Sequence, residues 1–227
     1  MKKTKKPYNK GDAYEARIFK LLNRLGLSPF GYSRAGAGGG TDCLFIHQGQ
    51  SYNLEVKKDL KADYGQRYLK WSENEGWSWC KDDEVSKFYT GIGILDLVER
   101  KKIRPNRYLL KKADITLEDK KADQKAFEDR TVTIGPEAFL DYYAKKSVFY
   151  IQIGDGYGFY SLKDDPAKLN APKFEGGFTL RLRCKTIHSR ENYLYGFLAV
   201  LKPLGKPNKS SFNLERGKGQ KFPPISP

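Results

Sequence analysis

The sequence predicts an α/β fold in which a mixed central β-sheet is flanked by helices and followed by a β-rich C-terminal portion. Three observations support this fold class. An amphipathic helix is expected near the N-terminus, two apolar runs around a turn follow it, and strand-like apolar patterns dominate from residue 148 onward. The 227 residues suffice for one large domain or for one domain with an added subdomain.

Residues 12–26 are predicted to form the first helix. Asp12 can cap its N-terminus, and Glu15 stands at the third helical position, which is the arrangement of a capping box. Apolar residues follow at helical spacing up to Gly26, which favours the end of a helix. Glu15 shares the face of these apolar residues, so its carboxylate is expected to need a partner in the fold.

Two apolar runs, residues 42–46 and 52–56, lie on either side of a glycine-containing turn and predict a β-hairpin. Side chains alternate across a strand, so Glu55 and Lys57 project from the same face, roughly 6–7 Å apart along it. Asp42 opens the neighbouring strand, and the hairpin can therefore bring it beside Glu55. The pattern predicts two acids and one base clustered at the rim of a sheet.

A metal ion would stabilise this cluster. Two adjacent carboxylates repel each other unless a cation lies between them. Mg²⁺ suits such a site because it prefers oxygen ligands and takes only one or two protein carboxylates. A bound Mg²⁺ activates water and neutralises charge on a scissile phosphate.

Asp42 followed by Glu55-Val56-Lys57 resembles the strand signature of the PD-(D/E)XK nuclease superfamily. This superfamily includes type II restriction enzymes, Holliday-junction resolvases and phage exonucleases. The resemblance covers about residues 10–75, and Thr41 stands where the eponymous motif has proline.

Further positions of the superfamily also have counterparts in this sequence. Members often carry a glutamate on the first helix, and Glu15 matches it in order. Some branches have Gln or Tyr at the start of the next helix, where Tyr64 and Gln66 stand, so a helix is expected to begin near Gln66.

The resemblance implies a restriction-endonuclease-like core that hydrolyses DNA phosphodiester bonds with Mg²⁺ and leaves 5′-phosphates. Asp42 and Glu55 would bind the metal, and the Val56 carbonyl would add a ligand. Lys57 would orient or deprotonate the water or stabilise the transition state, and Glu15 would support the metal. Mn²⁺ is expected to substitute, the site is expected at the rim of the second and third strands, and a homodimer would suit double-strand cleavage.

On this interpretation the chain has four parts. We expect a flexible basic arm at 1–10, a nuclease core at 11–145, a β-rich DNA-contacting portion at 146–201 and a basic, proline-rich tail at 202–227. Within them, a strand is expected around 92–98, a helix at 136–145, a hairpin at 148–153 and 157–162, and further strands at 178–185 and 195–201.

The net charge of +15 favours a nucleic-acid partner, because Lys and Arg release condensed counterions from a polyanion. The basic strand face at 181–185 could equally be an ordinary solvent face, and the glycine-rich loop at 34–41 a simple flexible connection. The candidate DNA-contacting residues are Arg34, Lys58, Gln66, Arg181, Arg183 and Lys185.

Other features of the sequence argue against a membrane protein or a secreted protein. No run of apolar residues is long enough to span a membrane, the charged N-terminus does not resemble a signal peptide, and three dispersed cysteines give no disulfide framework. We therefore expect a reducing cytoplasmic or nuclear location, with no membrane partner and no secretion. An endonuclease, restriction-like or structure-specific, is the favoured function. A non-catalytic DNA-binding protein, an exonuclease or resolvase of the same superfamily, and an RNA-directed protein are its alternatives.

Overall fold

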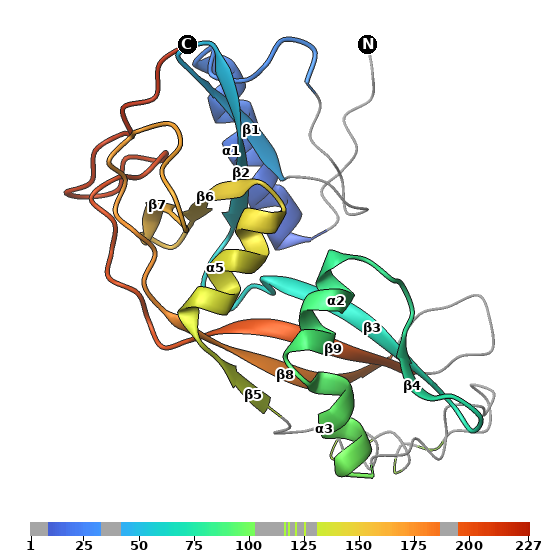
Figure 1. The fold of residues 1–227 in the computed structure, drawn as a ribbon. Coiled ribbons are helices and arrows are strands. Elements are labelled where there is room, and N and C mark those ends of the chain that lie inside the picture. The colour runs from blue at the N-terminus through green and yellow to red at the C-terminus, as the bar shows by residue number, and fades with distance from the viewer. Residues whose placement is uncertain are drawn as a thin grey trace. The chain divides into compact units, whose positions relative to one another are not determined.

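The computed structural model describes residues 9–32, 42–102, 131–186 and 195–227, together with residues 116, 118, 121 and 125. For residues 180–186 and 195–197 only the backbone is described. Helices and two β-sheets make up the structure, so the predicted mixed α/β class is confirmed (Figure 1). No helix among the described residues is long and apolar enough to cross a lipid bilayer.

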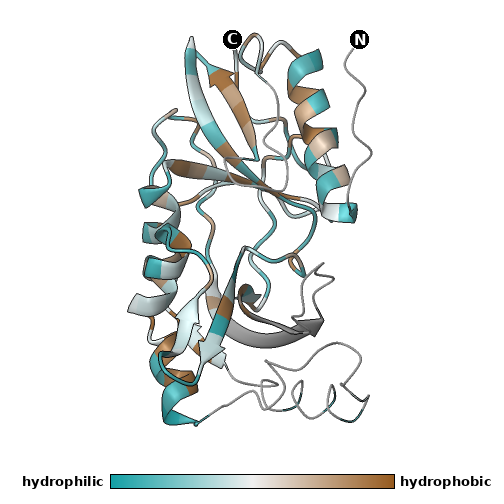
Figure 2. Ribbon diagram, turned by 90° about the vertical axis from the view of Figure 1, so that its right-hand side faces the viewer, coloured by the Kyte–Doolittle hydropathy of each residue, from teal (hydrophilic) through white to brown (hydrophobic). Residues whose placement is uncertain are grey.

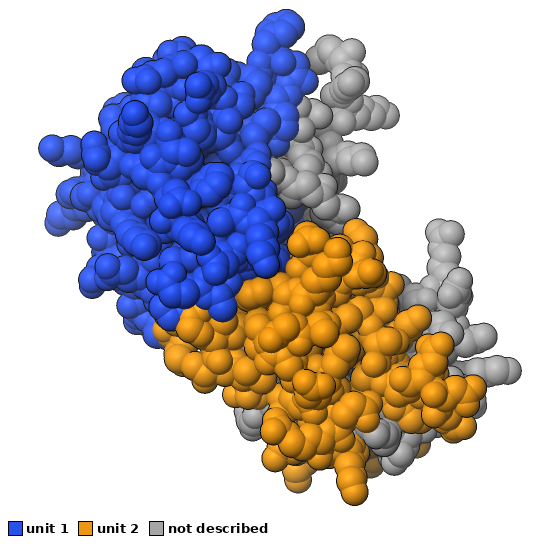
Figure 3. Space-filling view, viewed as in Figure 1, with its two compact units in different colours: residues 1–62, 136–176, 205–227 blue, residues 63–135, 177–204 orange. Residues whose placement is uncertain are grey.

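The chain divides into two compact units, which Figure 3 shows in different colours. Unit 1 contains residues 1–62, 136–176 and 205–227, and unit 2 contains residues 63–135 and 177–204. These boundaries differ from those expected from the sequence, because strand pairing joins stretches that are far apart along the chain.

Unit 1 contains a four-stranded mixed sheet of order β1-β2-β6-β7. Strands β2 and β6 are parallel, and the other two pairs are antiparallel. The predictions of a helix at 136–145 and of a hairpin at 148–153 and 157–162 are confirmed. Its elements are α1 (Lys10–Arg24), β1 (Cys43–His47), β2 (Gln50–Lys57), α5 (Pro136–Lys145), β6 (Val148–Ile153) and β7 (Gly158–Ser161).

Helix α1 begins two residues before the predicted start. Its N-cap is Asn9, whose side chain accepts a hydrogen bond from the Asp12 N–H at 3.0 Å, so the prediction of Asp12 as the cap is wrong. The buried side chains, Tyr14, Ile18 and Leu22, recur every four residues and face the sheet. Figure 2 shows this mixture of apolar and polar residues along α1.

The predicted β1–β2 hairpin is confirmed, and its turn residues Gln48 and Gly49 both have positive φ, as a tight two-residue turn requires. Leu54 and Val56 of β2 pack into the same apolar cluster as the buried face of α1. Glu55 lies on the other face of β2, where a tyrosine of α5 contacts it. Helices α1 and α5 therefore cover opposite faces of the sheet.

The C-terminal segment, residues 205–227, belongs to the core of unit 1, although it contains no named helix or strand. Leu214 and Ile225 are buried in the same cluster as α1. The basic, proline-rich tail expected at 202–227 is therefore part of the folded core from residue 205 on, because apolar side chains between its prolines and lysines are buried.

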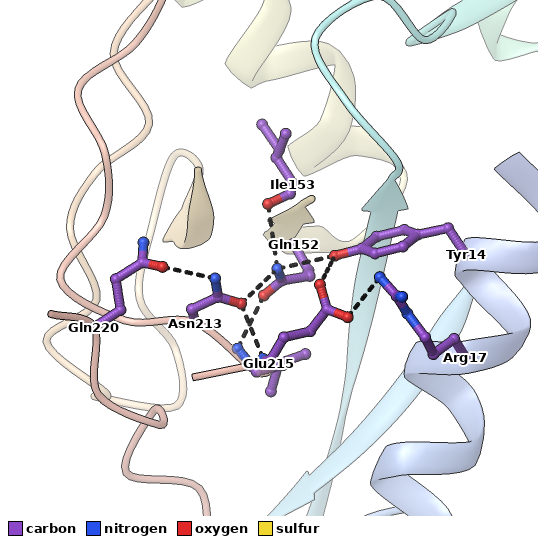
Figure 4. Close-up of polar contacts among 8 residues, drawn as sticks. Tyr14, Arg17, Gln152, Ile153, Asn213, Glu215 and Gln220 are labelled. Atoms are coloured by element: carbon purple, nitrogen blue, oxygen red, sulfur yellow. Dashed lines mark hydrogen bonds and ion pairs between the residues drawn. The ribbon is translucent and has the colours of Figure 1, made fainter. Parts of the chain in front are cut away.

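A buried polar network fastens this segment (Figure 4). The Gln152 side-chain N–H₂ group donates to Tyr14 Oη at 3.2 Å and to Asn213 Oδ1 at 3.0 Å, and Gln152 Oε1 accepts from the Leu214 N–H at 3.2 Å. Gln152 is fully buried, so these bonds satisfy polar atoms that would otherwise destabilise the fold. The network links α1, β6 and the C-terminal segment.

Unit 2 contains an antiparallel five-stranded sheet of order β4-β3-β9-β8-β5. The predicted strands at 178–185 and 195–201 are confirmed as its longest pair. The elements are β3 (Gly65–Ser72), β4 (Gly76–Trp79), α2 (Glu84–Gly91), α3 (Ile94–Arg100), β5 (Thr131–Ile134), β8 (Gly177–Thr186) and β9 (Tyr195–Leu204).

Two sequence predictions in unit 2 are wrong. The segment from Gln66 is strand β3 and not a helix, because it pairs with β9 on one side and β4 on the other. The strand expected at 92–98 is instead helix α3, preceded by Gly93 in the left-handed conformation with φ 84°. Gly91 ends α2, so the glycines separate two short helices.

Candidate active site

The acidic and basic side chains predicted to cluster come from the first two strands of the described chain. Asp42 directly precedes β1, while Glu55 and Lys57 lie near the end of β2. Pairing of Cys43 with Leu54 places Asp42 opposite Glu55 by continuation of the antiparallel register. Among the described residues no strand precedes β1, so the site lies on the first and second strands and not on the second and third.

The three side chains are brought together in a largely buried position. Lys57 Nζ lies 2.6 Å from Glu55 Oε1 and 3.9 Å from Asp42 Oδ2. The exposed fractions of these side chains are 13% for Lys57, 8% for Glu55 and 21% for Asp42. The Val56 N–H donates to Asp42 Oδ2 at 2.9 Å, which fixes that carboxylate against the peptide between the other two residues.

The electrostatics of the cluster are those of two carboxylates that share one ammonium group. Burial and the neighbouring charges of Glu55 and Glu15 raise the pKa of Asp42 from 3.8 to about 7, although Lys57 and the Val56 N–H act in the opposite direction. Burial would lower the pKa of Lys57, but Glu55 and Asp42 raise it above its ordinary value. Lys57 is therefore held as a cation, and the site favours additional positive charge.

Glu15 lies close enough to the cluster to act on it. Its charge contributes to the raised pKa values of both Asp42 and Lys57. The Cys43 thiol lies 3.9 Å from the backbone carbonyl oxygen of Glu15, so α1 contacts the start of β1 at this point. The capping-box alternative is wrong, because α1 begins at Lys10 with Asn9 as its cap.

Tyr143 also belongs to the site, although it is not among the site residues expected from the sequence. Its hydroxyl donates to Glu55 Oε1 at 3.1 Å from helix α5, and its ring is fully buried. Burial and the charge of Glu55 raise the pKa of Tyr143 well above its ordinary value, so the phenol remains a donor. The sequence predicts the helix at 136–145, but the parallel β2–β6 pairing is what brings its tyrosine to Glu55.

The turn after β6 supports the end of β2. The Gly154 N–H donates to the Lys57 carbonyl oxygen at 2.8 Å. A Cβ atom at Gly154 would lie 2.3 Å from the Lys58 carbonyl oxygen, which is far inside van der Waals contact. Only glycine allows this close approach, and the approach fixes the backbone that carries Lys57 and Lys58.

Of the remaining predicted residues, Lys58 belongs to unit 1, Tyr64 and Gln66 belong to unit 2, and Arg34 is not among the described residues. Lys58 follows β2 directly and forms a 3.2 Å ion pair with Asp59. Gln66 is exposed on β3 in unit 2, so its predicted place at a helix N-terminus is wrong, and Tyr64 is buried against Phe178. Arg34 lies outside the described residues.

Three basic residues of β8 occupy alternate positions, as the predicted face requires. Arg181 pairs with Val200 and Arg183 with Leu198 across β8 and β9, and Lys185 follows in the same register. Their backbone alone is described. The strand is confirmed, whereas a role in binding DNA stays a prediction.

The donor set of the cluster is compatible with a metal ion of the Mg²⁺ type. Within the described ranges no group of three or more His, Cys, Asp and Glu side chains is arranged to hold a metal. Mg²⁺ needs fewer protein ligands, since it keeps several waters and binds through one or two carboxylates. Asp42 and Glu55 supply two such carboxylates, and the pKa of Asp42 is raised by burial first and then by the negative charges of Glu55 and Glu15.

Comparisons with known proteins give no match for this chain, whether with protein-family models, curated proteins or solved structures. The function is therefore argued from the residues and geometry described above.

Proposed function

We propose that this protein hydrolyses DNA phosphodiester bonds with Mg²⁺, using Asp42, Glu55 and Lys57 on a restriction-endonuclease-like core. The observation that carries the proposal is the burial of two carboxylates and one ammonium group within 3.9 Å on the end of a hairpin. Clusters with strongly perturbed pKa values are typical of functional sites, since a fold gains no stability by crowding like charges. The mixed sheet, with α1 and α5 on opposite faces, is compatible with such a core.

Each residue of the cluster has a definite role in this mechanism. Asp42 and Glu55 would hold Mg²⁺, and the Val56 carbonyl is the proposed third ligand. The metal supplies positive charge to the phosphate and lowers the pKa of a bound water. Tyr143 holds Glu55 in place through its 3.1 Å hydrogen bond, and Glu15 adds negative charge from α1.

Lys57 acts in this proposal as a fixed positive charge. The carboxylates raise its pKa, so the ammonium form is favoured over the free amine that a general base would need. An ammonium group in a buried site stabilises the charge that develops on a phosphate in the transition state, because little water competes with it. Of the roles expected from the sequence, transition-state stabilisation therefore has the most support.

The overall charge supports a DNA substrate. Unit 1, which carries the cluster, contains 22 Lys and Arg residues against 12 Asp and Glu residues. A basic surface around a phosphodiesterase site concentrates a polyanionic substrate and speeds its association.

The test compares two matched aspartate substitutions. Wild type, Asp42→Asn and Asp164→Asn, at an exposed position of unit 1, are incubated with plasmid, linear and four-way-junction DNA in Mg²⁺ or Mn²⁺. We expect cleavage by wild type and Asp164→Asn and a loss of about 10²-fold or more for Asp42→Asn. Discrete fragments would indicate a restriction-like endonuclease, symmetric junction nicks a resolvase, and mononucleotides an exonuclease. Equal rates for Asp42→Asn and wild type would refute the site.

A non-catalytic DNA-binding protein is the second candidate. The observation that favours it is the 2.6 Å ion pair between Lys57 and Glu55, which neutralises one carboxylate without any metal. Tight binding of all three DNA forms, without cleavage under any metal condition, would support this candidate over the enzyme.

A further inference from the structure

Two surface hollows of unit 1 meet on the outer side of helix α1. The larger has a volume of about 780 Å³ and lies between α1 and the C-terminal segment. The smaller, of about 510 Å³, lies between the start of α1, the end of β2 and the β6–β7 turn. Ala13 and Arg17 line both hollows, so the two adjoin along α1, and together they are called the depression.

Basic side chains border this depression along its length. Arg17, Lys20 and Arg24 recur at intervals of three and four residues, which places them on one face of α1. We call the following residues the α1 track: Lys10, Arg17, Lys20, Arg24, Lys58 and Arg216.

Three acidic residues also line the depression, and two of them are paired. Glu215 accepts a hydrogen bond from the Tyr14 hydroxyl at 3.0 Å and forms a 2.6 Å ion pair with Arg17 (Figure 4). Asp59 is paired with Lys58, while Asp155 lies in the β6–β7 turn. Six basic groups against three acids leave the lining positively charged.

The cations at the α1 end of the track are available to a ligand. Lys20 and Arg24 are exposed and make no ion pair with any described residue. Across the hollow, the Arg216 guanidinium lies 5.5 Å from the centre of the Phe222 ring, and it too has no carboxylate partner in the described chain. Three unneutralised cations around an elongated hollow are complementary to a chain of phosphates.

The track begins beside the candidate active site. Lys58 directly follows Lys57, although the two side chains point in different directions along the end of β2. From Lys10 to Arg24 the helix extends about 21 Å, which equals about six phosphate steps of one DNA strand. The track is therefore long enough to contact several successive phosphates of one strand.

We propose that the α1 track binds the sugar-phosphate backbone of the substrate DNA on one side of the scissile bond. This inference rests on the proposed function for its direction, but not for its test, because backbone binding can be measured without cleavage. The track fixes the path of the DNA through phosphate contacts and carries no sequence information itself. Sequence or shape must then be recognised elsewhere on the protein.

The experiment compares two triple substitutions that remove the same charge. The track variant is Lys20→Ala, Arg24→Ala and Arg216→Ala, and the control is Lys145→Ala, Lys173→Ala and Lys206→Ala. All six residues are exposed in unit 1, and the control residues do not line the depression. Binding of a labelled DNA duplex is measured by fluorescence anisotropy in EDTA at several salt concentrations, with circular dichroism as a check on folding.

We expect the track variant to bind about 10- to 100-fold more weakly and to lower the slope of log K against log salt by about 2 to 3. The control should change both quantities much less. Equal losses in the two variants would show that net charge alone matters and would overturn the inference. So would unchanged binding by the track variant. If its binding to a poly-glutamate peptide falls as much as binding to DNA, the track is a general anion surface and the DNA assignment fails.

Failure of the proposed function leaves a different signature. Suppose the protein never cleaves DNA, but its affinity depends on the track residues and not on the control lysines. The DNA-binding role of the α1 track would then be supported, and the proposed nuclease function would be refuted. If both triple variants bind and cleave DNA as the wild type does, the role of the α1 track is refuted and the proposed nuclease function stands.

Discussion

Two charged clusters, each containing an aspartate and one in each unit, have opposite electrostatic properties. In unit 2, Asp83 caps helix α2, accepts hydrogen bonds from the Val85 and Ser86 N–H groups at 3.1 Å and pairs with Arg67. Burial would raise the pKa of Asp83, but the Ser86 backbone hydrogen bond and Arg67 lower it. In unit 1, burial and like charges raise the pKa of Asp42 to about 7.

On the proposed function, this difference separates a structural carboxylate, Asp83, from a functional one, Asp42. Asp83 has more donors than it needs, so its charged form stabilises the fold. Asp42 has one backbone donor and competes with Glu55 for Lys57, so its charged form costs stability unless another cation arrives. An electrostatically unfavourable site of this kind is typical of a place where a ligand or a reaction uses the charge, which supports the function proposed for unit 1.

The largest expected effect is on DNA cleavage, and it should distinguish the cation of the unit 1 cluster from the cation of the unit 2 cluster. Lys57→Ala should lower single-turnover DNA cleavage by about 10²- to 10³-fold, because it removes a fixed positive charge from the buried site. Arg67→Ala should reduce thermal stability and leave the cleavage rate close to that of the wild type. Rates are measured at saturating DNA. If both variants cleave equally well, the contrast between the clusters has no functional meaning.

The next prediction concerns the pH dependence of stability. The folded pKa of Asp42 is raised from 3.8 to about 7, so its contribution to stability is present below about pH 4 and is lost as the pH rises to about 7. Asp83 has the opposite effect on stability, because its pKa is lowered in the folded state. Its contribution to stability is present at pH values above its ordinary pKa and is lost as the pH falls. Urea unfolding from pH 4 to 8 in EDTA should therefore show Asp42→Asn gaining stability relative to wild type as the pH rises. A constant difference would contradict the raised pKa.

Magnesium should act on the same group. Protons and Mg²⁺ compete for the Asp42 carboxylate, so the increase in melting temperature on adding Mg²⁺ should be larger at pH 8 than at pH 6. Asp83→Asn should retain this dependence, and Asp42→Asn should lose it. Thermal unfolding by differential scanning fluorimetry provides the measurement, with NaCl at matched ionic strength as the control for screening.

Tyr143→Phe should have a smaller effect. It removes the 3.1 Å hydrogen bond to Glu55, and the unfolding free energy should fall by about 1 to 2 kcal/mol. If Tyr143 positions Glu55, the variant should also need more Mg²⁺ for half-maximal cleavage, which a purely structural role would not change. Tyr142→Phe, one residue away on the same helix, is the control and should leave the Mg²⁺ requirement unaltered.

The smallest expected effect lies in the unit 2 cluster. Ser86 Oγ accepts a hydrogen bond from the Asp83 N–H at 2.8 Å and completes a capping box. Ser86→Ala should lower the unfolding free energy by about 1 kcal/mol, in the range of other helix caps. Chemical denaturation measures it, and a change in cleavage rate would show that the two clusters are not independent.

Much of unit 1 was predictable because its signals are local. The β1–β2 hairpin follows from two apolar runs around Gly49, and α5 follows from Pro136 and the helical spacing after it. Alternation along β2 placed Glu55 and Lys57 on one face, and the hairpin brought Asp42 to them. These inferences need only neighbours within about fifteen residues.

The errors occurred where distant pairing decides the structure. Strand β3 lies between β4 and β9, and β9 begins at Tyr195, so the local sequence near Gln66 contains little sign of its partner. The contact between Tyr143 and Glu55 likewise crosses 88 positions. The C-terminal segment was mistaken for a tail because its prolines and lysines suppress any regular pattern, while Leu214 and Ile225 are too few to reveal a core.

Unit 1 is built from stretches that are far apart along the chain, and this affects when its site is assembled. Its sheet cannot close until residues 148–153 pair with β2, and its core is incomplete until Leu214 and Ile225 are in place. Contacts across such long sequence separations slow folding, because the entropic cost of closing the long loops comes before the stabilisation from packing. During synthesis, therefore, Asp42, Glu55 and Lys57 leave the ribosome long before they can act together. The core around the cluster is therefore completed late, only after residues 205–227 have been made.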